Sequence, residues 1–122
     1  MDIHTGGGSM RIEPSSLSKV NPDHPRHRER MEAMLAFLTP LSFVWTIPAH
    51  GEKTVGILTD EAVGQGKLVV ETELGGGTYC PATGHHVATR GLRNVLRHLK
   101  VLVDEAATSR SVSPLSRVFC HC

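Results

Sequence analysis

Short apolar segments alternate with amphipathic segments along this chain, and that alternation most constrains the fold it can adopt. Residues 41–47 and 67–73 are brief runs rich in β-branched or other apolar residues, which is typical of buried strands. Residues 84–102 place apolar side chains along one helical stripe, and another helix is expected from about Asp23 until Pro40 ends it. Strands that alternate with helices indicate a sheet with helices packed on it. We therefore predict an α/β fold.

The remaining segments carry weaker patterns. Residues 53–63 are amphipathic enough for a further helix, which the glycines at 64 and 66 would end. Residues 11–22 contain two prolines and several serines, so they are expected to form an irregular loop. Residues 104–122 show no sustained period, and we expect an irregular C-terminal tail there.

The helix that begins near Asp23 is expected to bury its apolar residues and to expose its charged ones. Its apolar positions at helical spacing are Met31, Met34, Leu35 and Leu38. Arg30 and its charged neighbours should then lie on the other faces. His24 and His27 flank the start of the helix and are expected to be solvated.

Charge and composition narrow the classes of partner. The 122-residue chain carries 13 Lys and Arg against 12 Asp and Glu, which gives a formal net charge of +1. Nucleic acids and anionic membranes usually bind proteins with a basic excess, so neither partner is expected. No apolar run approaches the roughly 20 residues that span a bilayer, and the N-terminus lacks the pattern of a signal peptide. We therefore expect a protein of the reducing cytoplasm.

Two glycine-flanked strand ends carry side chains suited to chemistry. Residues 2–8 read Asp-Ile-His-Thr-Gly-Gly-Gly, and residues 71–77 read Glu-Thr-Glu-Leu-Gly-Gly-Gly. In α/β sheets, ligands bind beyond the carboxyl ends of strands. The His4 imidazole could bind Zn²⁺, with Asp2 on the same face to fix its tautomer. Glu73 could move a proton there if the strand ends are neighbours; both residues could equally be structural or solvated.

Both motifs resemble signatures of one protein family. Residues 2–7 resemble the Asp-(Leu/Ile)-His-(Ser/Thr)-Gly-Gly motif of the succinylglutamate desuccinylase/aspartoacylase family. Residues 72–77 resemble the Thr-Glu-Leu-Gly-Gly signature of the same family. Residues 91–99 resemble the helix that follows, especially in the subgroup that deacylates N-acetyl-diaminobutyrate-like amides. The resemblance covers roughly residues 1–103, which we interpret as a partial deacylase catalytic domain.

The resemblance implies a zinc-dependent amide hydrolase with a carboxypeptidase-like mixed sheet flanked by helices. In such enzymes the metal is held by the His and Glu of an early His-Gly-x-Glu motif and by a later His, which His4 matches. Glu73 matches the general base that activates water and then protonates the departing amine. Zinc would lower the pKa of that water and polarise the amide carbonyl. The implied substrate is a small N-acyl amino acid or a related amide.

The chain departs from the family pattern at the first zinc ligands. No His-Gly-x-Glu motif precedes His4, and the sequence His50-Gly51-Glu52-Lys53 is interpreted as a turn. Since catalytic zinc normally has three protein ligands, we expect an internal fragment, incomplete at both ends and inactive alone. Its expected partner is the missing part of the enzyme or a second copy. The alternative is a non-catalytic α/β remnant or interaction module that binds no metal tightly.

The cysteines allow one further arrangement. Cys120-His121-Cys122 could be assembled with Cys80, His85 and His86 into a second metal site. The Cys-His-Cys spacing does not match structural zinc patterns, in which paired ligands lie about two to four residues apart. An irregular tail is the favoured interpretation, and a metal-storage or sensing role is the weaker alternative.

Overall fold

The computed structural model of the chain describes residues 1–20, 24–46, 57–77, 81–103 and 117–121. Within these residues, strands alternate with helices as predicted, except that the first two strands follow one another without a helix between them. The elements are β1 Asp2–His4, β2 Ser15–Val20, α1 His27–Ala36, β3 Leu41–Thr46, α2 Leu58–Gly64, β4 Glu71–Glu73, α3 Ala82–His98 and β5 Arg117–His121.

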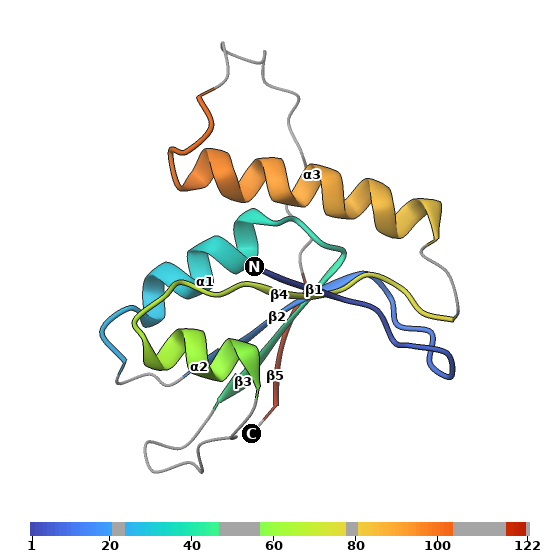
Figure 1. The fold of residues 1–122 in the computed structure, drawn as a ribbon, viewed down its shortest axis with the longest axis horizontal. Helices are drawn as coiled ribbons and strands as arrows, with labels where there is room; N and C mark the ends of the chain where they lie inside the picture. The colour runs from blue at the N-terminus through green and yellow to red at the C-terminus, as the bar shows by residue number, and fades with distance from the viewer. Residues whose placement is uncertain (21–23, 47–56, 78–80, 104–116, 122) are drawn as a thin grey trace.

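The strands form one mixed sheet in the order β1-β4-β2-β3-β5 (Figure 1). β1 is parallel to β4, β3 is parallel to both β2 and β5, and β2 is antiparallel to β4. On one face, α1 and α3 pack over Val70 and Leu74, which flank β4. On the other face lies α2, where the Lys19 Nζ donates to Asp60 Oδ1 at 2.9 Å. The predicted α/β class, with helices flanking a mixed sheet, is confirmed.

The core lies between α1, α3 and β4. Phe37, directly after α1, is fully buried there, and it packs with Val70, Leu74 and Val95. The α3 backbone approaches the Phe37 ring at Gly91, where a Cβ atom would overlap the ring. Only glycine fits at this crossing. The helix pair therefore holds β4, and with it the strand end that carries Glu73.

Strand β2 corrects the prediction of an irregular loop over residues 11–22. Ser15–Val20 form a strand that pairs with β3 on one side and β4 on the other. Its serines are buried, and the Ser16 Oγ lies 2.8 Å from Thr39 Oγ1 and 3.1 Å from Ser42 Oγ. Buried polar side chains that satisfy one another give no apolar alternation, so the sequence pattern hid this strand.

The C-terminal stretch also departs from expectation. Residues 117–121 were expected to belong to an irregular tail over 104–122. In the structure they form β5 and pair in parallel with β3. Strand β5 is hydrogen-bonded to β3, which is distant in the sequence, so the local sequence pattern does not predict it. Residues 104–116 lie outside the described part, and the boundary at residue 103 stays a prediction.

Other element limits shift without changing the order. Of the strand predicted over 67–73, only Glu71–Glu73 pair as β4. The helix predicted over 53–63 is α2, Leu58–Gly64, with residues 53–56 outside the described part. Among the described helices, none is both long and apolar enough to cross a bilayer.

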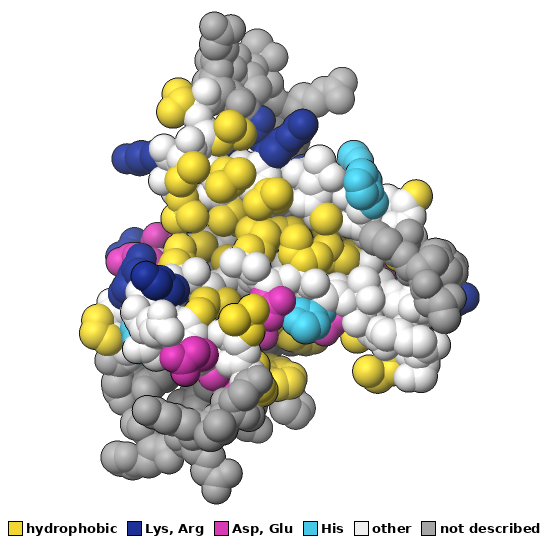
Figure 2. All heavy atoms as spheres, in the orientation of Figure 1, with side chains coloured by type: hydrophobic (Ala, Val, Ile, Leu, Met, Phe, Trp, Pro, Cys, Tyr) yellow, Lys and Arg dark blue, Asp and Glu magenta, His cyan; other side chains and the backbone are white. Residues whose placement is uncertain are grey.

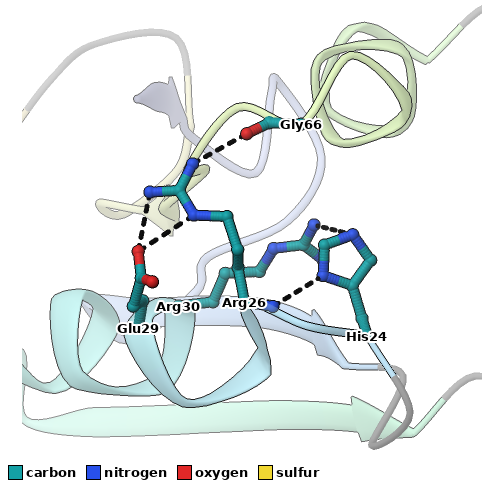
Figure 3. A network of polar contacts seen from close by, with 5 residues as sticks. All are labelled: His24, Arg26, Glu29, Arg30 and Gly66. Carbon is teal, nitrogen blue, oxygen red and sulfur yellow. Dashed lines mark hydrogen bonds and ion pairs between the residues drawn. The ribbon is translucent and has the colours of Figure 1, made fainter.

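A charged cluster lies at the start of α1 (Figure 3). Arg26 donates from Nε and Nη2 to Glu29 Oε2 at 2.9 and 2.7 Å, and from Nη1 to the Gly66 carbonyl at 2.7 Å. Arg30, expected on an outer face, is instead 3% exposed, with its Nη2 3.1 Å from His24 Nε2. His24 also accepts a bond at Nδ1 from the Arg26 N–H at 3.1 Å. His24 is half-buried with both ring nitrogens in contact with this cluster, so it is less solvated than predicted. His27 is also half-buried, and its Nδ1 is buried.

Candidate functional site

The two glycine-flanked strand ends lie side by side. In the parallel register of β1 and β4, His4 is the partner of Glu73 and Asp2 is the partner of Glu71. Paired residues on adjacent strands point their side chains to the same face of the sheet. The pairing continues into the glycine loops, where the Gly6 N–H donates to the Gly75 carbonyl at 2.8 Å. The two strand ends are therefore neighbours in the fold, as the predicted role of Glu73 requires.

Asp2 holds the His4 ring in one orientation. The distance between His4 Nε2 and Asp2 Oδ2 is 3.0 Å, which leaves Nδ1 as the ring atom able to bind a metal. The His4 side chain is 56% exposed, whereas Asp2 is 22% exposed. The hydrogen bond to Asp2 raises the pKa of His4, and the charges of Asp2, Glu73 and Glu71 act in the same direction. These carboxylates thus favour the protonated, positively charged form of the His4 ring.

Glu73 keeps one carboxylate oxygen without a partner. Its Oε2 is buried and makes no hydrogen bond within the described part of the chain. The same is true of the Oγ of Ser15, which faces Glu73 across the β2–β4 pairing. Buried polar atoms are nearly always satisfied, so these two neighbouring atoms are free to bond to a ligand or water. Three other described atoms, in α1 and α2, are also buried without a partner: His27 Nδ1, Arg30 Nε and Thr59 Oγ1. The sequence alone does not predict a role for Ser15, because only the sheet register places it beside Glu73.

Glu71 lies two residues before Glu73 on the same face but in a different setting. Burial raises the pKa of the Glu71 carboxyl, and the positive charge of Lys19 opposes that rise. Lys19 itself is paired with Asp60 of α2. Glu71 is thus enclosed between strand and helix and sits away from the strand end.

The glycine loop after β4 allows another segment to approach closely. A Cβ atom at Gly76 would overlap the Met10 carbonyl, and the Gly77 N–H donates to that carbonyl at 3.2 Å. Only glycine permits this contact between the loops that follow β1 and β4. The glycines therefore hold the two strand ends together.

The described residues offer part of a metal site. His4, oriented by Asp2, fits the geometry of a single zinc ligand. Within the described ranges, no group of three or more His, Cys, Asp or Glu side chains could hold a metal ion. A catalytic zinc needs about three protein ligands, so these residues do not make the complete set. Residues 50–53 and Cys80, singled out in the sequence, lie outside the described part.

Comparison with known proteins gives the family. Residues 1–99 match the model of the succinylglutamate desuccinylase/aspartoacylase catalytic domain. The chain belongs to this family. It is 33% identical over 106 residues to the N-alpha-acetyl-L-2,4-diaminobutyric acid deacetylase of Halomonas elongata, covering 86% of this chain and 30% of that protein.

Solved structures show the same fold. The product-bound ectoine utilization protein EutE (DoeB) of Ruegeria pomeroyi matches with a TM-score of 0.78 and 28% identity, over 98% of this chain and 33% of that one. A succinylglutamate desuccinylase of Silicibacter sp. TM1040 matches with a TM-score of 0.74 and 31% identity, over 90% of this chain and 32% of that one. The resemblance inferred from the motifs is confirmed. The chain spans about a third of the length of these relatives.

Proposed function

We propose that this chain supplies one zinc ligand, His4, and the catalytic base, Glu73, to a hydrolase that cleaves a small N-acyl amide. The observation that carries the proposal is the pairing of His4 with Glu73 at the end of two parallel strands. The ligand set of the described residues is incomplete, so catalysis requires further ligands from another segment. The chain alone is therefore inactive in this proposal.

Glu73 carries the proton through the reaction. Its carboxylate takes a proton from water as the water oxygen bonds to the amide carbonyl carbon. The C–N bond then breaks, and Glu73 returns the proton to the departing nitrogen, which leaves a carboxylic acid and an amine. When bound, zinc polarises the carbonyl and acidifies the water. The free, buried Oε2 of Glu73 is the atom available to hold that proton.

The relatives indicate the class of substrate. The Halomonas elongata protein is a deacetylase of N-alpha-acetyl-L-2,4-diaminobutyric acid. We propose that the substrate is a small N-acetylated diamino acid and that the protein acts in the cytoplasm. The proposal includes no nucleic-acid or membrane partner. His4 would help to hold the metal that polarises the amide carbonyl of that substrate, and Glu73 would take the proton from the attacking water.

The experiment supplies the absent ligands in trans. We define the Halomonas scaffold as the Halomonas elongata deacetylase in which a short glycine-serine linker replaces the segment that matches this chain. The 122-residue chain is mixed with the scaffold and zinc, and the release of acetate from N-acetyl-diaminobutyrate is followed. We expect hydrolysis by the mixture and none by either component.

Glu73→Gln and Glu71→Gln form a matched pair, because both glutamates lie on β4 and face the same side. Glu73→Gln removes the proton acceptor, and kcat should fall by about 10²–10⁴ with zinc retained. Glu71→Gln should change kcat less than about threefold. Equal activity of Glu73→Gln and the unmodified chain would show that the base is assigned wrongly.

The incomplete ligand set also favours a second candidate, a non-catalytic α/β interaction module. Such a module would bind no zinc tightly, alone or with the scaffold, and would hydrolyse nothing in the mixture. Equilibrium dialysis against zinc separates the two candidates before any activity is measured.

A further inference from the structure

Arg30 of α1 is a buried cation without a counter-ion among the described residues. It is 3% exposed, and its Nε is buried with no hydrogen-bond partner in the described part of the chain. On the same helix, Arg28 is paired with Glu32, and beside its start Arg26 is paired with Glu29. None of the ion pairs between described residues includes Arg30. Because a buried charge is costly unless an opposite charge or hydrogen bonds compensate it, Arg30 is expected to bind a negative group.

The polar contact between Arg30 and His24 sets two donors against each other. Arg30 Nη2 lies 3.1 Å from His24 Nε2, and the Arg26 N–H donates to His24 Nδ1 at 3.1 Å (Figure 3). A guanidinium group only donates, and a neutral imidazole accepts at one nitrogen alone. When Nδ1 accepts from Arg26, Nε2 carries the proton, and that proton faces the N–H groups of Arg30. Both side chains therefore present donors to the same place, which an acceptor would satisfy.

The surroundings of this pair are also positive. Helix α1 begins at His27 without a side-chain cap hydrogen bond, and the N-terminus of a helix carries partial positive charge. His27 lies three residues before Arg30 and so on the same side of α1, and its Nδ1 is buried without a described partner. Figure 2 shows Lys and Arg side chains at the surface near the start of α1, at the left of the view. The positive potential and the unsatisfied donors thus coincide.

From this cluster we infer that the start of α1 binds a small oxyanion between His24 and Arg30, at a site separate from the candidate site at the end of β4. The anion accepts hydrogen bonds from the Arg30 guanidinium and from His24 Nε2, and it replaces the contact between two donors. Its charge compensates the buried Arg30, whereas Arg26 is already neutralised by Glu29. Guanidinium groups and helix N-termini bind both carboxylates and phosphates, so the test compares these two sources.

The direct measurement is an NMR titration of the 122-residue chain with sodium acetate and, separately, with inorganic phosphate. The ionic strength is held constant with sodium chloride, so that general screening does not contribute. The signal is the Arg30 Nε–H resonance, which is assigned by its loss in Arg30→Met. We expect this resonance to shift saturably with at least one of the two anions, and the anion with the lower Kd identifies the source.

Thermal unfolding of variants gives a second measurement. An anion that binds the folded chain raises its Tm, by about 5 °C at ten times the Kd. Arg30→Met should lose this rise, and its Tm without the anion should be no lower than that of the unmodified chain, because an apolar side chain replaces an unpaired buried charge. Arg28→Met is the matched control, since Arg28 lies on the same helix and is 89% exposed, and it should keep the full rise.

The inference fails if neither anion shifts the Arg30 resonance saturably, or if the Tm of Arg30→Met rises as much as that of the unmodified chain. A large fall in the Tm of Arg30→Met without the anion would also overturn it, because Arg30 would then have a partner within the chain. Asp23 precedes His24 in the sequence and lies outside the described residues. A saturable shift that appears only in Asp23→Asn would identify the Asp23 carboxylate as that partner and would overturn the inference as well.

Discussion

Two polar clusters of the molecule differ in character, one at the start of α1 and one at the end of β4. At the start of α1, Arg26 makes two hydrogen bonds to Glu29 and one to the Gly66 carbonyl (Figure 3). At the end of β4, Glu73 keeps a buried oxygen without a described partner, and the His4 side chain is 56% exposed. The first cluster pairs Arg26 through all three of its guanidinium nitrogens, although Arg30 Nε there is also buried without a hydrogen-bond partner in the described part. The second cluster leaves its buried carboxylate oxygen unpaired at the strand end where the proposed function places the chemistry, and functional sites are where local rules are expected to be broken.

The largest expected difference between the two clusters is in their effect on zinc affinity. Asp2→Asn should weaken zinc binding to the mixture of chain and scaffold about 10–100-fold, because loss of a carboxylate that orients a metal-binding histidine typically has this effect. Competition with a chromogenic chelator measures the affinity. Arg26→Ala, at the start of α1, is the control and should leave the zinc affinity unchanged. Equal affinity for zinc in both variants would show that the two clusters do not differ in their role in metal binding.

Packing between α1 and α3 should affect the stability of the fold without changing the candidate site at His4 and Glu73. Gly91→Ala places a methyl group against the Phe37 ring and should reduce the free energy of unfolding by about 1–3 kcal/mol. Gly64→Ala adds the same group to open space in α2 and should be neutral or slightly stabilising. Urea denaturation of both variants gives the comparison. An undiminished stability of Gly91→Ala would show that the α1–α3 crossing is looser than the structure describes.

The charged cluster at the start of α1 should contribute modestly to stability. Arg26→Ala removes bonds between groups that are 40% and 55% exposed, so the expected loss is about 1 kcal/mol or less. Hydrolysis by the mixture should be unaffected. A loss of activity at unchanged stability would contradict the separation of this cluster from the catalytic site.

The smallest effect concerns pH. Burial lowers the pKa of His24, and the charges of Arg30 and Arg26 lower it further. The unfolded chain takes up this proton near pH 6.5, before the folded chain does, so stability falls as the pH drops from about 6.5 through the folded pKa. NMR titration of the His24 ring and denaturation at pH 7 and 5 measure the effect. His24→Gln should lose less stability between these pH values than the unmodified chain, and an identical loss would refute the assignment.

The sequence was sufficient for the fold class and for the site motifs, for different reasons. The apolar periods of α3 and β3 were strong, and the residues around His4 and Glu73 resembled family signatures. The position of β2 was missed because its serines are buried: Ser16 makes side-chain hydrogen bonds to Thr39 and Ser42, and Ser15 pairs with Glu73 in the sheet. No hydrophobic period reveals such contacts. Ser15 and the burial of Arg30 were missed for the same reason, since both depend on partners distant in sequence.

The central claim, that His4 is a metal ligand beside Glu73 at the end of two parallel strands, is tested most directly by zinc stoichiometry. The isolated mixture of chain and Halomonas scaffold is dialysed against low zinc, and the bound metal is counted by atomic absorption. The account predicts one tight zinc per complex, retained in Glu73→Gln, lost in His4→Ala, and absent from the 122-residue chain alone. Retention of the full zinc content in His4→Ala would contradict it.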